Sequence, residues 1–139
     1  MIGLLYRAAD ALRRRKLAHI ITGFGEDLAH RYLRKQGCTI VARRYRPNSG
    51  GGEIDLVAWH KEILIFVEVK TRASGEFGAP ERAVDAEKQI YLAHAGRDYA
   101  RRANMPWEKV RFDIIGVVLT HPPEIDWIRD AFRPAPFSR

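Results

Sequence analysis

Cysteine is nearly absent from this chain of 139 residues, since Cys38 is the only one. A single cysteine excludes an internal disulfide and a zinc ribbon, and it is typical of a reducing compartment. The five histidines are scattered and lack the i, i+4 spacing of a helical zinc site. No apolar run approaches the roughly 18 residues of a membrane span, and the first residues do not follow the order of a signal peptide. We therefore expect a cytoplasmic protein with no membrane partner.

Acidic residues are outnumbered by basic ones. The chain has 24 Lys and Arg against 17 Asp and Glu, a formal charge of +7. This balance favours a nucleic-acid partner, although a solvated basic surface, an acidic protein or a membrane surface would also account for charge alone. The length fits one domain. There is no internal repeat, and Gly50-Gly51-Gly52 is not followed by the Gly-Lys-Ser/Thr of a phosphate-binding loop.

Apolar periodicity predicts two helices, three strands, a third helix and two more strands, in that order. This order predicts a single-domain α/β fold with a mixed central β-sheet flanked by helices. We place a basic helical extension at 1–19, the folded domain at 20–130 and a flexible tail at 131–139. The expected helices are 3–18, 24–36 and 81–103, and the expected strands begin near 38, 53, 65, 111 and 124.

The two expected long helices of the domain each have a predicted buried stripe. In the helix 24–36 the stripe is Phe24, Leu28, Ala29, Tyr32 and Leu33. In the helix 81–103 it is Val84, Ile90, Tyr91, Ala95 and Tyr99.

Acidic residues interrupt two strand-like segments in the middle of the chain. A hairpin that turns near Lys61-Glu62 would place Asp55 opposite Glu68, and Glu53 opposite Lys70. Directly opposed residues share a face, with Cβ atoms about 5 Å apart. Glu68 and Lys70 share that face because side chains alternate along a strand. The spacing therefore predicts a cluster of carboxylates and a lysine.

Two neighbouring carboxylates repel each other unless a cation lies between them. Mg²⁺ binds one or two carboxylates and keeps several waters, and it can activate water for attack on a phosphodiester. Lys70 would stabilise charge on the phosphate or orient the attacking water. A salt bridge from Lys70 to Asp55 or Glu68 at a sheet edge explains the same residues about equally well.

Glu26 lies at the edge of the apolar arc of the expected helix 24–36, while Asp27 lies outside it. Glu26 could therefore face a site inside the domain. As an acid in the first turn of a helix, Glu26 could equally interact favourably with the positive end of the helix dipole. That interaction stabilises a helix by a few tenths of a kcal/mol.

Taken together, several ordered motifs resemble one family over about residues 20–120. They resemble the YraN-type bacterial proteins of the restriction-endonuclease-like superfamily. Asp55 with Glu68-x-Lys70 is similar to that superfamily's PD-(D/E)xK nuclease signature without its proline. Arg44-Tyr45 departs from the Arg-Asn usual in the family. The motifs are Gly25-Glu26, Gly52-Glu53-Ile54-Asp55-Leu56, Phe66-Val67-Glu68-Val69-Lys70-Thr71-Arg72, Val84-Asp85-x-x-Lys88 and Arg111-Phe112-Asp113.

This resemblance implies a Mg²⁺- or Mn²⁺-dependent endonuclease that hydrolyses DNA, with branched or junction DNA as a candidate substrate. By similarity to Holliday-junction resolvases, Glu26 would join Asp55 and Glu68 as a metal ligand, and Lys70 would complete the catalytic set. We expect nucleic-acid contacts from Arg43, Arg44, Arg46, Arg72 and Lys88. A resolvase would be expected to form a homodimer, because two cuts need two sites related by a two-fold axis.

Two other hypotheses remain open. The chain could be a non-catalytic nucleic-acid-binding protein that keeps the nuclease fold. The basic segment 3–16, with an apolar stripe at positions 4, 5, 8, 9 and 12, could contact nucleic-acid phosphates or a membrane surface. That segment could also be a helix with a solvated basic face.

Overall fold

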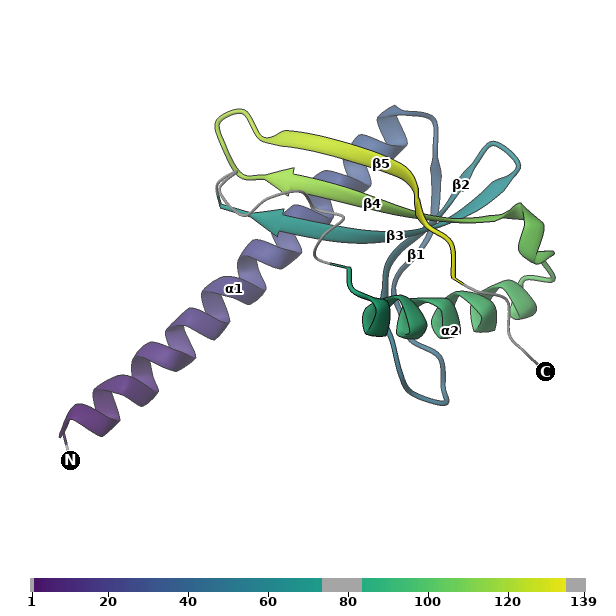
Figure 1. Cartoon of the computed structure of the whole chain (residues 1–139). Coiled ribbons are helices and arrows are strands. Elements are labelled where there is room, and N and C mark those ends of the chain that lie inside the picture. Colours follow the sequence, from purple (N-terminus) through teal and green to yellow (C-terminus); the bar gives the residue numbers. More distant parts are fainter. Residues whose placement is uncertain (1, 74–83, 135–139) are drawn as a thin grey trace.

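The computed structural model describes residues 2–73 and 84–134 (Figure 1). A long helix is followed by three strands, a second helix, a single 3-10 turn and two more strands. In chain order they are α1 (Ile2–Lys35), β1 (Thr39–Tyr45), β2 (Ile54–His60), β3 (Ile63–Arg72), α2 (Ala86–Arg102), η3 (Trp107–Lys109), β4 (Val110–Val118) and β5 (Glu124–Phe132).

The five strands form one sheet in the order β1-β2-β3-β4-β5. Strands β3 and β4 are parallel, and every other neighbouring pair is antiparallel. A parallel pair needs a crossover connection, and α2 lies in the connection between β3 and β4. The predicted mixed sheet with helices is therefore confirmed, and it is consistent with a restriction-endonuclease-like fold.

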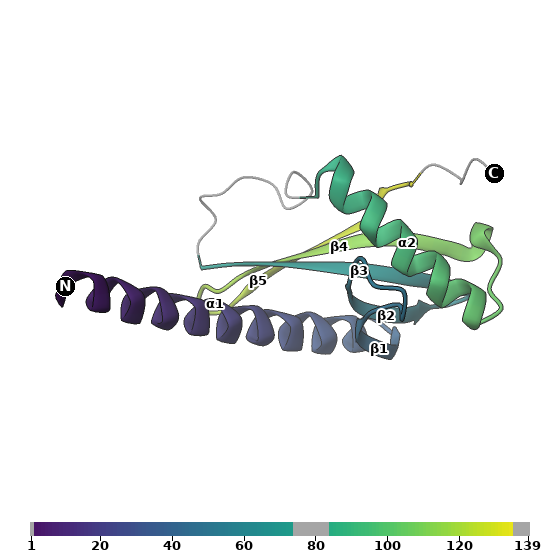
Figure 2. The ribbon, with the colours of Figure 1, turned by 90° about the horizontal axis from the view of Figure 1, so that it is seen from below.

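The two helices lie on opposite faces of the sheet (Figure 2). Alternate residues of β3 divide between two apolar clusters, because successive side chains of a strand point to opposite faces. Ile65 and Val67 join Ala29 and Leu33 of α1, whereas Phe66 belongs to the cluster that includes α2. Both faces of β3 are covered, so Glu68, which shares the face of Phe66, lies on the side of the sheet that α2 covers.

The first helix is continuous, so the expected break between helices 3–18 and 24–36 was wrong. Glycine inside a helix costs only about 1 kcal/mol, and Gly23 does not interrupt α1. The helix ends as predicted at Gly37, which has φ 91°, and the N–H of Cys38 bonds to the carbonyl of Leu33 at 2.9 Å. Phe24, expected in the buried stripe, is 49% exposed.

Asp85 caps the N-terminus of α2, where its carboxylate accepts a hydrogen bond of 2.9 Å from the N–H of Lys88. Val84 and Asp85 therefore precede the helix, and the rest of its expected first turn, residues 81–83, lies outside the described residues. Ile90 and Tyr91 of the expected stripe are exposed, by 69% and 48%. Ala95 of the expected stripe is buried, as predicted, and the other buried residues of α2 are Leu92, Ala93, Gly96, Asp98 and Ala100.

Strand β5 is joined to β4 by a buried carboxylate. Asp113 is fully buried and accepts four hydrogen bonds of 2.8–2.9 Å, two of them from Arg111. The others come from the Trp127 indole N–H and the backbone N–H of Asp130. The ladder between the two strands shifts register between Phe112 and Ile114, so Asp113 stabilises this irregularity.

The chain ends are only partly described. β5 continues through Phe132, inside the segment expected to be a tail, and residues 135–139 lie outside the described part. Within residues 2–73 and 84–134, no helix combines the length and apolar character needed to cross a bilayer.

Candidate functional site

The hairpin of β2 and β3 has the predicted register. Paired residues run from His60 opposite Ile63 to Leu56 opposite Val67, with a two-residue turn at Lys61-Glu62. Continued by one residue, this register places Asp55 opposite Glu68. The ladder changes at this point, because the N–H of Val69 bonds to the Asp55 carboxylate at 2.8 Å.

Burial and a neighbouring acid act together on Asp55. Loss of hydration is the main cause that raises its pKa from 3.8 to about 7, and the Glu68 carboxylate raises it further. The hydrogen bond from the Val69 N–H opposes this shift. The free protein therefore holds Asp55 partly protonated near neutral pH.

Glu68 is only 6% exposed and has two lysine partners. The ammonium of Lys88, from the first turn of α2, lies 2.5 Å from Glu68 Oε1, and that of Lys70 lies 3.2 Å from the same oxygen. Burial lowers the pKa of Lys70, and the adjacent Lys88 lowers it further. Burial also opposes the charge of Lys88, but its bonds to Glu68 and Lys70 outweigh burial and raise its pKa.

Glu26 faces inward, one of the two alternatives that its position in the helix left open, with 3% exposure, whereas the Asp27 side chain is 51% exposed. The Glu26 carboxylate lies 2.9 Å from Arg44 Nε and 3.5 Å from an Arg43 Nη. Two consecutive strand residues normally point to opposite faces, yet both arginines reach this carboxylate. Arg44 has φ 51°, a left-handed conformation that is costly for a residue with a Cβ.

The turn of α1 that carries Glu26 lies directly against β3. A Cβ added to Gly25 would collide with the side chain of Thr71. The Thr71 hydroxyl is buried and has no hydrogen-bond partner among the described residues. This close approach sets Glu26 near the end of β3, and its charge contributes to the raised pKa of Asp55.

The three predicted metal ligands are not gathered into one cluster. In the part of the chain that the structure describes, no three Asp, Glu, His or Cys side chains are arranged to hold a metal ion. Asp55 and Glu68 are brought together, and Glu26 is held by arginines. Two carboxylates are a donor set that suits Mg²⁺, which fills its other positions with water. A divalent cation would also relieve the repulsion that raises the pKa of Asp55.

Most of the predicted nucleic-acid-binding cations are paired with acids of the same region. Arg43 and Arg44 contact Glu26, Arg43 also lies 2.9 Å from Asp27, and Lys88 contacts Glu68. Arg46 lies 2.5 Å from Glu53. Arg72 is the last residue of β3, and its carbonyl accepts a bond of 2.9 Å from the Leu119 N–H.

The glycine-rich loop between β1 and β2 lies against α2. Gly52 has φ 73°, and a Cβ there would collide with the Tyr91 carbonyl. The Ser49 hydroxyl lies 3.2 Å from the His94 ring. This contact keeps the segment that leads into Asp55 close to α2, which carries Lys88.

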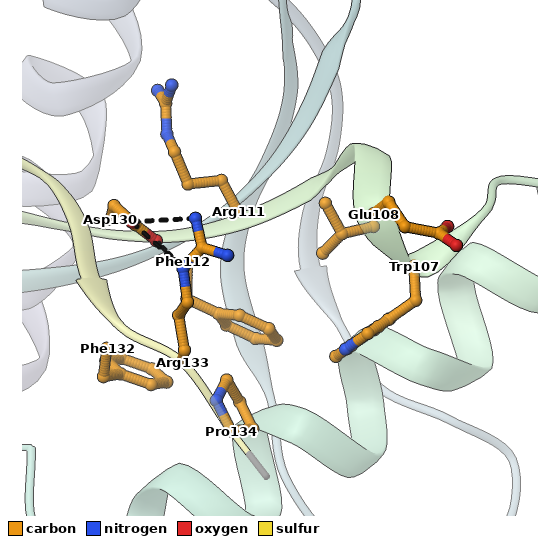
Figure 3. Close-up of a pocket in the computed structure, with 9 residues that line it drawn as sticks. Trp107, Glu108, Arg111, Phe112, Asp130, Phe132, Arg133 and Pro134 are labelled. Carbon is orange, nitrogen blue, oxygen red and sulfur yellow. Dashed lines mark hydrogen bonds and ion pairs between the residues drawn. The ribbon is translucent and has the colours of Figure 1, made fainter. Parts of the chain in front are cut away.

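A separate cavity of about 510 Å³ lies beside the start of β4 and the end of β5 (Figure 3). Trp107, Phe112 and Phe132 line it, together with the ion pair between Asp130 and Arg133 at 3.0 Å. None of its lining residues belongs to the Asp55–Glu68 site.

The sequence reasoning assigned Lys88 to DNA and missed its contact with Glu68. The signal was present, because Asp is one of the residues that commonly cap the N-terminus of a helix. A cap at Asp85 places Lys88 in the first turn of α2, whereas in the expected helix 81–103 it would lie beyond the first turn. The reasoning also missed the hydrogen bond from the Tyr45 hydroxyl to the buried Asp98 carboxylate, which links β1 to α2.

Comparison with known proteins identifies the family. The model of the uncharacterised protein family UPF0102 matches residues 25–117. A UPF0102 protein of Solibacter usitatus is 62% identical over 132 residues, covering 95% of this chain and all of the relative. One of Rhodococcus opacus is 41% identical over 110 residues, covering 78% and 92%. One of Koribacter versatilis is 43% identical over 118 residues, covering 82% and 80%. The chain therefore belongs to the UPF0102 family.

Proposed function

We propose that this protein is a metal-dependent endonuclease of the restriction-endonuclease-like superfamily that hydrolyses DNA phosphodiester bonds. The observation that carries the proposal is the pairing of Asp55 with Glu68 under α2, with Lys70 and Lys88 on the Glu68 carboxylate. Structural ion pairs are usually exposed, whereas Glu68 is buried here. Loss of hydration, with the neighbouring Glu68 charge, raises the pKa of Asp55 to about 7.

Asp55 and Glu68 are the residues that would hold Mg²⁺ or Mn²⁺. When bound, such an ion neutralises charge on a phosphate and makes a water more acidic. The hydrogen bond from Val69 N–H fixes one Asp55 oxygen. Glu68 is only 6% exposed, so its carboxylate is largely shielded from bulk water.

Lys70 is suited to stabilise negative charge on the phosphate that is attacked. Its ammonium lies 3.2 Å from Glu68 and is partly desolvated, so its interaction with a phosphate oxygen is strong. Lys88 contacts the same oxygen of the carboxylate at 2.5 Å and so positions Glu68. The two lysines compete with a divalent cation for Glu68, and they are the groups that substrate phosphate would draw away.

Arg43, Arg44, Arg46 and Arg72 provide positive charge around the site and would contact the DNA backbone. Affinity that depends on phosphate contacts falls steeply with salt. When phosphates engage Arg43 and Arg44, Glu26 loses the partners it has in the free protein. Glu26 then becomes available to the site, which is the role that we propose for it.

The test is nicking of labelled linear duplex, single-stranded and four-way-junction DNA with Mg²⁺, Mn²⁺ or EDTA. We expect metal-dependent cleavage that falls at least 100-fold in Asp55→Asn and in Lys70→Ala. Lys109→Ala, at an exposed lysine of η3, is the matched control and should cleave as the unchanged protein does. Cleavage of the junction in preference to linear duplex, by a homodimer, would identify a resolvase.

A second candidate function is non-catalytic binding of nucleic acid by the same fold. The observation that favours it is that Glu26 and Glu68 each form ion pairs with two basic residues. Both carboxylates therefore already have positively charged partners without a metal ion. Folded protein that binds DNA but leaves all three substrates intact in Mg²⁺ and Mn²⁺ would support this function. In that case Asp55→Asn would change stability and leave DNA affinity unchanged.

A further inference from the structure

The N-terminal part of α1 extends beyond the sheet. Figures 1 and 2 show the helix continuing away from the strands towards its N-terminus. The UPF0102 match begins at Gly25, so the preceding part of the helix lies outside the family's matched region. Residues 2–24, which we call the helical arm, therefore need an explanation separate from the Asp55–Glu68 site.

Large apolar side chains of the helical arm are exposed. A monomer rarely exposes so many large apolar residues in one segment, and such a surface marks an interaction site. The exposed fractions are 72% for Leu4 and Leu5, 65% for Tyr6 and Leu12, 57% for Leu17 and Ile20, and 49% for Phe24.

The first half of the helical arm is amphipathic. Leu5, Ala8 and Leu12 follow the i, i+3, i+7 spacing that places side chains on one side of a helix, whereas Arg7 and Arg14 lie on the other side. A polypeptide with this pattern buries the apolar side and keeps the basic side in contact with water or anions.

The helical arm is also strongly basic. It has five Arg and Lys residues and one acid, Asp10, for a formal charge of +4 with His19 neutral. Four of the basic residues form the run Arg13-Arg14-Arg15-Lys16. Two copies of the arm side by side would repel each other through this charge. DNA phosphates would neutralise this positive charge, but the leucine side chains would stay exposed to water.

We propose that the helical arm binds the surface of a bilayer that contains anionic lipids. Such a surface buries the side of the helix that carries Leu5, Ala8 and Leu12 near the acyl boundary, and it places Arg and Lys beside the anionic headgroups. The arm would lie along the surface, since it is not apolar enough to cross a bilayer. This inference does not rest on the proposed nuclease activity.

The test is flotation of the full-length protein with vesicles of phosphatidylglycerol and phosphatidylcholine, and with vesicles of phosphatidylcholine alone. We expect at least tenfold stronger binding to the anionic vesicles and a decrease with salt. The double variants Leu5→Ser/Leu12→Ser and Arg14→Glu/Arg15→Glu should each weaken binding at least tenfold. Lys61→Glu/Lys109→Glu makes the same charge change at exposed positions of the domain and should bind within twofold of the unchanged protein.

Four results would overturn the inference, with circular dichroism used to verify that each variant is folded. One is the absence of flotation with anionic vesicles. Another is retention of vesicle binding in Leu5→Ser/Leu12→Ser, which would show that binding depends on positive charge and not on the apolar side of the arm. The third is a loss of duplex DNA binding in Arg14→Glu/Arg15→Glu with vesicle binding unchanged, which would make nucleic acid the partner. A dimer that Leu5→Ser/Leu12→Ser dissociates, without any lipid binding, would assign the arm to a second copy.

Discussion

Lys88 lies 2.5 Å from Glu68, and this contact joins the first turn of α2 to the middle of β3. Glu68 is 6% exposed, so its charge depends on the lysines beside it. The contact couples the start of the crossover helix to the carboxylate that we propose as a metal ligand. A cation that binds Glu68 must therefore compete with Lys88.

Replacing Lys88 by Gln should raise the affinity for divalent cations several-fold, because the metal then no longer has to displace the Lys88 ammonium from Glu68. It should also lower the free energy of unfolding by about 1–2 kcal/mol, since Lys70 remains as a partner of the buried carboxylate. Calorimetric titration with Mn²⁺ and urea unfolding measure the two effects. Lys109→Gln is the control, and unchanged metal affinity in Lys88→Gln would contradict this competition.

The stability of the protein should depend on the charge of Asp55. Its pKa is raised from 3.8 to about 7, so the folded state binds the proton more tightly than the unfolded chain does. The unchanged protein should therefore lose stability as the pH rises from about 4 through 7, by about 4 kcal/mol at most. Asp55→Asn keeps the acceptor for Val69 N–H and carries no charge.

We expect Asp55→Asn to be more stabilising at pH 8 than at pH 5, as measured by urea unfolding at both pH values. Mg²⁺ at pH 8 should stabilise the unchanged protein and leave the variant unaffected. A difference between the two proteins that does not vary with pH would show that Asp55 has no raised pKa.

The left-handed conformation of Arg44 should be visible in a pair of substitutions. Arg44→Gly and Arg44→Ala both remove the 2.9 Å contact with Glu26, but only glycine adopts φ 51° without a Cβ penalty. We expect Arg44→Gly to be about 1 kcal/mol more stable than Arg44→Ala in urea unfolding. Equal stabilities would mean that the strand relaxes when the side chain is removed.

Much of the site could be predicted because strand periodicity is strict. The parity of Asp55, Glu68 and Lys70 required only an even-numbered turn, and the turn at Lys61-Glu62 supplies it. Helix periodicity placed Glu26 at the edge of the apolar arc and left its orientation open; the resemblance favoured the inward one, and the side chain is buried. These expectations depend on residues close in sequence, where geometry leaves few alternatives.

The partners of these residues could not be predicted, because they come from distant segments. Arg44 reaches Glu26 through a backbone conformation that its residue type does not favour. Ile90 and Tyr91 fit the apolar period of α2 but are exposed, because the small residues Ala93, Ala95 and Gly96 face the sheet instead. Close approach of helix and sheet selects small side chains, and an apolar periodicity alone does not reveal that.

Removal of the Asp113 carboxylate should lower the free energy of unfolding more than most single substitutions do. It is fully buried and neutralises Arg111, whose Nε lies 2.8 Å away and whose side chain is only 18% exposed. Asp113→Asn leaves that guanidinium without a counter-charge, and we expect a loss of about 3 kcal/mol in urea unfolding. Arg111→Met combined with Asp113→Asn should recover part of this loss, because the charge left unpaired is then gone. A loss below about 1 kcal/mol in Asp113→Asn would contradict the view that the charge of Asp113 is needed to neutralise the buried Arg111.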